Sequence, residues 1–304
     1  MAELKRYKGF LFAFIALFSW GIHGPAGRFL AINGVDMYFV TIMRFWLGAG
    51  VFFLFLFFKN ELKLNLKHEW KKVLLLSLIG LSGNSILYHL TLIYLPATLV
   101  MILENLSPIF VLFFSFVLLK EKPTFLQILA FLFSLAGLMF IVYGKHALTG
   151  IGSDYFLGIV LGVLTGMTFG FYTFFSADLI RPYRKQPIEI IRFLFKIFVI
   201  SSFTMLPLFI FKDMNKPSNF QQWFWLFEMG IFQSGVSYLF WNYALAYLKT
   251  NIVSILFLFT ILFTTINELI FLDLDLNKYL IAGGLFIVAS GYIISKEKGA
   301  VIIE

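Results

Sequence analysis

The chain has 304 residues and a mass of 35.0 kDa, with 60% apolar residues, 13% charged residues and a formal net charge of +8. Soluble domains contain about 25% charged residues and about 45–50% apolar residues. This composition therefore excludes an ordinary soluble enzyme and a disordered chain, and it indicates a polytopic membrane protein. The absence of cysteine excludes disulfides, thiolate metal sites and a cysteine nucleophile.

Ten segments contain the roughly 20 mostly apolar residues that a helix needs to cross the hydrocarbon layer. The break between the third and fourth segments is placed at Pro96, because proline disfavours helix in the residue before it. Runs such as 51–58 do not alternate as the strands of a transmembrane barrel do. The predicted spans are residues 10–32, 37–58, 73–95, 97–119, 124–143, 156–180, 188–211, 222–247, 251–272 and 277–295.

Lysine and arginine mark the cytoplasmic loops of membrane proteins. With the N-terminus inside, the cytoplasmic segments contain 16 of these residues and the outer loops contain 4, at Lys145, Lys212, Lys216 and Lys278. This asymmetry predicts a multi-pass protein of the cell membrane with both termini in the cytoplasm. It also accounts for the positive net charge without a nucleic-acid partner.

The two halves of the chain resemble each other. The pattern that starts at Tyr94-Leu95 returns at Tyr247-Leu248, and Gly137 returns at Gly291. Residues 1–145 and 146–304 are therefore predicted to be two five-helix repeats. Because five is odd, the second repeat enters the membrane from the opposite side, which is an arrangement found in many secondary transporters. The predicted fold is an all-α membrane protein of ten transmembrane helices in two inverted repeats.

With this repeat, the chain resembles the EamA-like family of the drug/metabolite transporter superfamily. The resemblance covers essentially the whole chain and is carried by short motifs: Trp20-Gly21, Arg44-Phe45, Leu106-Ser107-Pro108, Leu118-Leu119-Lys120-Glu121, Gly137, Gly283-Gly284 and Gly291. It implies ten helices, cytoplasmic termini and a central cavity lined by spans one, three, four, six, eight and nine.

The chain departs from the family pattern in two places. The acidic residue usual at the end of span nine is Asp275, and Ile261 stands where the second half would carry the counterpart of Pro108. We therefore expect motion or coupling in the second half to differ from that in the first.

Several catalytic motifs are absent from the sequence. It has no G-x-x-x-x-G-K-[ST] loop for nucleotide phosphates and no H-E-x-x-H zinc helix. A G-x-S-x-G nucleophile turn is missing as well. The sequence therefore predicts that the protein is not an enzyme and uses neither a cofactor nor a metal.

Glu104 is the strongest candidate for a functional residue. A charged side chain at mid-membrane costs roughly 2.5–3.5 kcal/mol on insertion scales, so it marks function by default. Glu104 lies about ten ångströms below the outer face of span four, at 1.5 Å per residue. Asn105 follows it, and Pro108 frees the carbonyl of Glu104 from helix bonding. We predict that Glu104 binds a cationic group or a coupling proton, and a buried packing role is the alternative.

Polar and aromatic residues form matching stripes in spans three and eight, because i and i+4 share a helix face. We predict that these stripes line a substrate cavity, together with a histidine of span one whose ring would titrate between about pH 5 and 8. For the histidines, a packing role is equally consistent with the sequence. The predicted substrate-binding residues are Glu104, Asn105, His23, Asn84, Tyr88, His89, Tyr238, Trp241 and Asn242.

The remaining intramembrane charges receive other roles. Arg44 is predicted to be structural and paired with a carboxyl group or backbone carbonyls, and Glu268 to be a gate or an interfacial carboxylate. The other four are expected to be solvated near span ends: Asp178, Arg192, Lys196 and Glu228.

Span six repeats a small residue every four positions, which lets another helix approach closely. These residues are predicted to form a packing face together with the structural Pro108. They are Gly158, Gly162, Gly166 and Gly170.

These features predict a secondary active transporter that moves a small polar metabolite by alternating access, either proton-coupled or as an exchanger. Amino acids, amines and related organic solutes are the range that the resemblance implies. An uncoupled channel or facilitator for small solutes is the alternative. We expect the bilayer and the small-molecule substrate to be its partners, and the chain to act as a monomer, with a homodimer as the alternative.

Overall fold

The structure is a computed structural model that describes residues 2–62, 70–95, 97–144, 155–211, 214–271 and 276–297. Within these ranges the fold is helical and contains no β-strand. In chain order the elements are α1 (Ala2–Gly21), α2 (His23–Ile32), α3 (Met37–Phe58), α4 (Trp70–Leu75), the π-helix η1 (Leu76–Gly83), α5 (Asn84–Tyr94), α6 (Ala97–Glu104), α7 (Ser107–Leu119), α8 (Phe125–Gly144), α9 (Tyr155–Ile180), the 3₁₀ turn η2 (Arg181–Tyr183), α10 (Pro187–Met205), α11 (Leu208–Phe211), α12 (Phe220–Glu228), the π-helix η3 (Met229–Val236), α13 (Ser237–Tyr247), α14 (Thr250–Leu256), α15 (Phe259–Phe271) and α16 (Lys278–Ser295).

Eight helical stretches in the described residues are long and apolar enough to cross a membrane. They coincide with eight of the ten predicted spans: Leu4–Ile32, Met37–Phe58, Trp70–Tyr94, Leu99–Leu119, Phe125–Tyr143, Phe156–Tyr183, Thr250–Ile270 and Lys278–Ser295. The two other predicted spans, 188–211 and 222–247, fall on α10–α11 and on α12–η3–α13. Polar side chains such as Arg192 and Lys196 lower the hydropathy of the first of them.

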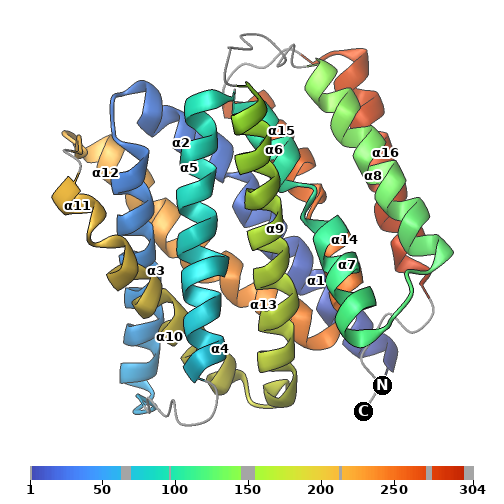
Figure 1. Ribbon diagram of the computed structural model, residues 1–304, viewed down its shortest axis with the longest axis horizontal. Coiled ribbons are helices and arrows are strands. Elements are labelled where there is room, and N and C mark those ends of the chain that lie inside the picture. The colour runs from blue at the N-terminus through green and yellow to red at the C-terminus, as the bar shows by residue number, and fades with distance from the viewer. Residues whose placement is uncertain are drawn as a thin grey trace.

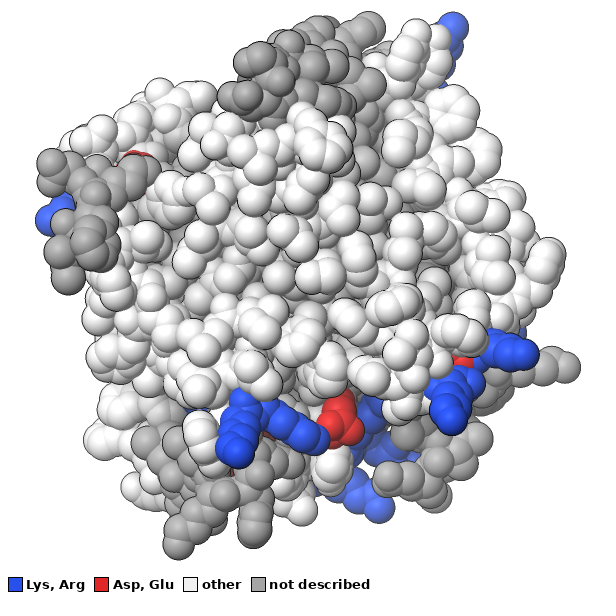
Figure 2. All heavy atoms as spheres, viewed as in Figure 1, with Lys and Arg blue, Asp and Glu red and all other residues white. Residues whose placement is uncertain are grey.

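The helices stand side by side in one bundle (Figure 1). The pair α8–α16 lies at one edge, and α3, α10, α11 and α12 lie at the other. The surface in Figure 2 is mostly uncharged, and Lys and Arg side chains gather along its lower edge. Large apolar side chains such as Phe53, Phe113 and Phe116 are more than 40% exposed. An apolar belt with a charged lower rim is the surface that a bilayer requires.

Irregular positions recur along the chain at a constant offset. The two π-helices start at Leu76 and Met229, which are 153 residues apart. Leu95 and Leu248, also 153 residues apart, both have extended backbones at the end of a helix. A π-turn is uncommon and frequently occurs at functional sites, so its return at one offset is a stronger sign of relatedness than helix content.

The packing between the halves is reciprocal. Helix α1 packs against α13 and α15, while its counterpart α9 packs against α5 and α7. In the same way, α3 packs against η3 and α10 packs against η1. The pairs α3–α10 and α8–α16 join counterparts directly. Each half therefore packs on the other in the same pattern.

The glycine series of α9 lies against the broken helix α6–α7. A Cβ at Gly162 would lie 2.3 Å from the Leu103 side chain, and one at Gly166 would lie 2.5 Å from the Leu103 carbonyl oxygen. Gly158 and Gly170 face Leu95 and the Ser107 carbonyl in the same way. These approaches leave no room for a larger side chain.

Gly166→Leu should therefore destabilise the protein, by 1–3 kcal/mol or more on the typical scale of overpacking. Backbone cannot yield as a flexible side chain can, so the helices must move apart. Thermal unfolding of the purified protein measures the effect. Gly50→Leu is the matched control, because nothing lies within 4 Å of a Cβ at that position. Equal melting temperatures for the two variants would contradict this packing.

Candidate functional site

The fourth span is broken beside Glu104. Helix α6 ends at Glu104 and α7 begins at Ser107, with Pro108 in its first turn. Proline lacks the N–H that would continue the upstream helix, and it fits the first turn of a new one. The second half has the same break between α14 and α15, although Ile261 replaces the proline. There the hydroxyl of Thr260 donates to the Phe257 carbonyl at 2.6 Å. The missing proline therefore does not remove the break.

Glu104 is a half-buried residue that interacts with two residues from other spans. Its carboxyl group lies close to the side chain of Asn84 and within electrostatic range of Arg44. The Asn84 amide donates to the Thr165 carbonyl at 2.9 Å and to the Thr168 hydroxyl at 3.2 Å, which fixes it against α9. Spans two, three, four and six thus meet at this carboxyl group.

Arg44 interacts electrostatically with two carboxyl groups. Its Nε donates to the Ser234 hydroxyl at 3.2 Å, and its guanidinium is within electrostatic range of Glu104 and Glu228. Glu228 also accepts from the Gln233 amide at 2.9 Å. The prediction of a solvated Glu228 is wrong, because α12 and η3 pack against α3 and bring this carboxyl group near Arg44. We name Arg44, Glu104 and Glu228 the charge cluster.

Aromatic side chains border the charge cluster. Tyr88 and Tyr238 are partly exposed, and both lie within electrostatic range of Arg44. The ring centroid of Tyr238 lies 5.3 Å from that of Trp20, 5.5 Å from that of Tyr172 and 5.1 Å from that of Phe198. These rings come from four spans, so they form a wall that crosses the boundary between the two halves.

Several predicted binding residues are buried. The Asn242 amide donates to the Tyr172 hydroxyl at 2.8 Å, and the ring centroids of Trp241 and Trp20 lie 5.2 Å apart. Neither Asn242 nor Trp241 is exposed. The Asn105 amide donates to the Met101 carbonyl at 2.8 Å and is also buried. Their other polar atoms, Asn105 Oδ1, Trp241 Nε1 and Asn242 Oδ1, have no hydrogen-bond partner within the described part of the chain.

The other predicted residues are distributed differently. The His89 ring is buried, within hydrogen-bond distance of the Ser85 carbonyl at 2.7 Å and of the Thr41 hydroxyl at 3.3 Å. Glu268 is partly exposed on α15. His23 lies on α2, and its side chain is outside the described residues, as is Asp275.

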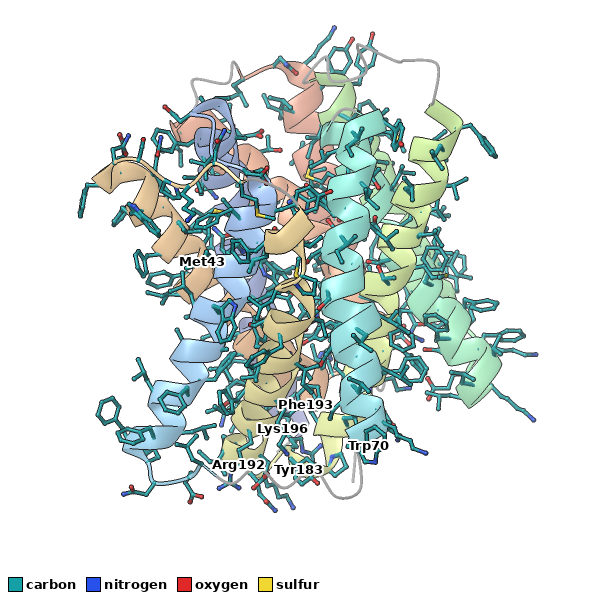
Figure 3. The ribbon with its side chains drawn as sticks, turned by 60° about the vertical axis from the view of Figure 1, so that its left-hand side comes forward. Met43, Trp70, Tyr183, Arg192, Phe193 and Lys196 are labelled. Carbon is teal, nitrogen blue, oxygen red and sulfur yellow. The ribbon has the colours of Figure 1, made fainter. Side chains whose placement is uncertain are left out.

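The prediction of a solvated Arg192 is also wrong. Its side chain is buried, donates from Nε to the Glu61 carbonyl at 2.9 Å, and pairs with the carboxylates of Glu61 and Glu189. Figure 3 shows Arg192 and Lys196 near Tyr183 at the lower end of the bundle, far from Met43 in the upper half. Since Met43 is the neighbour of Arg44, the Arg192 group and the charge cluster are separate features.

The two broken helices meet only below their breaks. Helix α7 packs against α14, and the Ser115 hydroxyl donates to Asn251 Oδ1 at 2.6 Å. Among the described residues, α6 and α15 make no comparable contact. All residues of α14 are buried, whereas Met101, Leu103 and Glu104 of its counterpart α6 remain partly exposed. The halves are therefore alike in secondary structure and different in exposure.

Known proteins similar to this chain are transporters. One is an uncharacterized transporter of Archaeoglobus fulgidus, 25% identical over 90% of this chain and 94% of its own length. Another, from Clostridium kluyveri, also has the name uncharacterized transporter and is 24% identical over 94% of this chain and 92% of its own length. A protein of known crystal structure shares the fold, with a TM-score of 0.80 and 18% identity over 95% of this chain and 98% of that one.

The sequence model of the EamA-like transporter family matches twice, at residues 7–143 and 156–296. Together these ranges cover almost the whole chain, and they agree with the helical fold and with the names of the similar proteins. The chain is accordingly a membrane transporter and not an enzyme, and it belongs to the EamA-like transporter family.

Proposed function

We propose that this transporter moves a small polar metabolite across the cell membrane by alternating access, as a monomer. Its ten spans form two inverted repeats, residues 1–145 and 146–304, with both termini in the cytoplasm. Two separate matches to one family model, the π-helices 153 residues apart and the reciprocal packing support this division. Secondary transporters built in this way bind substrate near the repeat interface.

The charge cluster and its aromatic wall are the proposed binding site. The observation that carries this proposal is the partial exposure of Glu104 and Arg44, two intramembrane charges from different spans, beside a helix break. Such charges are expensive in a bilayer and mark substrate or ion pathways. A carboxylate suits an ammonium group or a proton, and Arg44 suits a carboxylate. Amino acids, amines and related solutes fit this pair.

The unequal exposure of α6 and α14 supports the transport mechanism. With the lower ends of the broken helices joined by Ser115 and Asn251, the half-buried Glu104 would open to the upper half in this state. In the opposite state, α14 would be exposed and α6 enclosed, so that the counterparts exchange environments. The charge cluster would then open to the cytoplasm. Either a proton on Glu104 or exchange of substrates would couple the two states.

Reporter fusions at residues 65 and 215 should report opposite sides of the membrane, with residue 65 inside. The reason is the excess of lysine in the 59–72 segment. Activity-based reporters of cytoplasmic and external location provide the measurement, and fusions after the C-terminus provide an internal standard. Reports from the same side for both positions would contradict the inverted-repeat topology.

A ligand-stabilisation screen of the purified protein tests the substrate class. The set contains amino acids, amines, nucleosides and cationic dyes, and the measurement is the melting temperature. We expect stabilisation by amino acids or amines in the wild-type protein and its loss in Glu104→Gln. Stabilisation by nucleosides or dyes alone would contradict the proposed class.

A further inference from the structure

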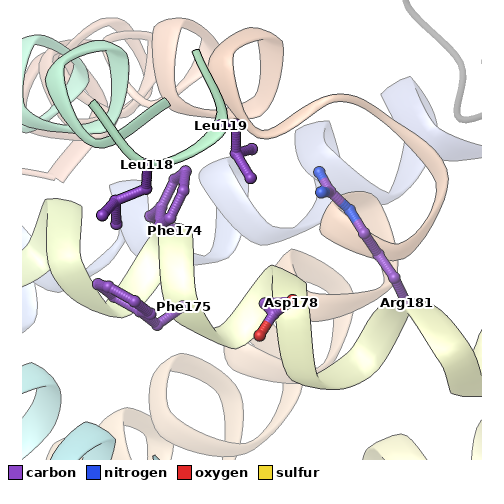
Figure 4. A pocket seen from close by; sticks show the side chains of 6 residues that line it. All are labelled: Leu118, Leu119, Phe174, Phe175, Asp178 and Arg181. Carbon is purple, nitrogen blue, oxygen red and sulfur yellow. The ribbon is translucent and has the colours of Figure 1, made fainter. Parts of the chain in front are cut away.

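A pocket lies at the lower ends of α7 and α9, away from the charge cluster. It has a volume of about 210 Å³ and is lined by Leu118, Leu119, Phe174, Phe175, Asp178 and Arg181. Figure 4 shows the apolar side chains on one side and Asp178 and Arg181 on the other. The pocket is therefore amphipathic.

The position of the pocket matches the boundary between the lipid tails and the headgroups. Leu118 and Leu119 are 53% and 51% exposed, and they directly precede the charged loop that begins at Lys120. Arg181 directly follows the last residue of α9. Apolar residues on the bilayer side and charges at the helix ends are what a bound phospholipid would contact.

Arg181 has an unused donor at this site. One terminal nitrogen of its guanidinium donates to the Thr250 hydroxyl at 2.6 Å. Its Nε is buried and has no hydrogen-bond partner among the described residues. A buried donor without a partner is unfavourable, because it has lost its hydrogen bonds to water and gained none in return. A phosphate oxygen is a strong acceptor for such a group.

The charges around Arg181 balance. Asp178 and Glu121 both lie within electrostatic range of Arg181, and Asp178 pairs with Lys72 at 2.9 Å. The side chains of Lys72 and Asp178 are 59% and 60% exposed, and an exposed pair of this kind contributes little to stability. A ligand ammonium can therefore replace Lys72 at little cost. Two positive and two negative groups suit a zwitterionic headgroup better than an anionic one.

We propose that this pocket binds phosphatidylethanolamine. The lipid phosphate accepts from Arg181, the primary ammonium contacts Asp178, and an acyl chain lies along Leu118 and Phe175. Because Arg181 also holds Thr250 at the start of α14, the bound lipid stabilises the contact between α9 and α14. The site does not depend on the identity of the transported substrate.

Lipid binding to the purified detergent-solubilised protein tests this proposal. Native mass spectrometry and melting temperature are measured with phosphatidylethanolamine, phosphatidylcholine, phosphatidylglycerol and free phosphoethanolamine. Wild-type protein should prefer phosphatidylethanolamine by about tenfold, equivalent to about 1.4 kcal/mol. Asp178→Asn should remove the preference over phosphatidylcholine, and Arg181→Gln should weaken the binding of both lipids. Lys72→Gln should strengthen the binding of phosphatidylethanolamine, because it frees Asp178.

Lys185→Gln is the matched control, since it removes a nearby exposed charge outside the pocket and should leave the preference unchanged. If Arg181→Gln fails to fold, Asp178→Asn and Lys72→Gln still decide the question, because they alter an exposed pair. Equal binding of the three lipids, or the same preference in Asp178→Asn as in the wild type, would overturn the proposal. So would free phosphoethanolamine binding as tightly as the lipid.

Discussion

Glu104→Gln should abolish concentrative transport while the protein keeps its fold. Glutamine retains the shape of glutamate and can still bond to Asn84, but it carries no charge for an ammonium group and releases no proton. Uptake by proteoliposomes and thermal unfolding give the two readouts. Lys185→Gln removes an exposed charge that belongs to neither proposed site and is the control, for which wild-type uptake is expected.

Exchange assays separate the two roles of Glu104. If it carries only the coupling proton, substrate counterflow should survive in Glu104→Gln. If it binds substrate, counterflow and concentrative uptake should both be lost. Wild-type uptake rates with an unchanged pH profile between about 5 and 8 would make Glu104 a packing residue, and the charge cluster would lose its central member.

Cross-linking α7 to α14 should stop transport as completely as the loss of Glu104. Ser115 and Asn251 hydrogen-bond below the helix breaks, where the proposed mechanism requires separation. The chain has no cysteine, so the double variant Ser115→Cys and Asn251→Cys contains the only two thiols. A short cleavable thiol linker should lock the cytoplasmic side, and reductive cleavage should restore uptake.

The two single-cysteine variants treated with the same linker are the controls. They should retain uptake, because one thiol cannot join the helices. Ligand stabilisation should persist in the cross-linked double variant, since its charge cluster stays accessible from the upper half. Full uptake by quantitatively cross-linked protein would show that α7 and α14 need not separate.

Local sequence features predicted much of the fold. Spans such as Met37–Phe58 are recognisable because a continuous apolar run of this length has few other stable placements. Pro108 predicted the loss of a backbone hydrogen bond at the Glu104 carbonyl, because proline acts on its own helix, and the structure breaks the helix there. The break between α14 and α15 has no proline to mark it in the sequence, and all residues of α14 are buried by other parts of the fold.

The sequence identified Glu104 as a member of the charge cluster but not the residues that lie close to it. Glu104 has no partner on its own helix, and its partners come from spans two and three. The same limit explains the errors at Glu228 and Arg192, since Arg192 pairs with Glu61, which is 131 positions away in the chain. The π-helices had only a weak signal: each has a Ser-Gly pair near its end, Ser82-Gly83 and Ser234-Gly235, but these pairs are 152 residues apart and the helices are 153 apart.

Counterflow is the most direct test of coupled, alternating-access transport. The ligand identified by stabilisation is used as a radiolabelled tracer in wild-type proteoliposomes, with unlabelled ligand at high concentration on the opposite side. Alternating access predicts saturable tracer entry that is accelerated by the unlabelled ligand and abolished in the cross-linked double variant. Tracer flux that rises linearly with concentration and shows no acceleration would identify an uncoupled channel or facilitator and contradict alternating access.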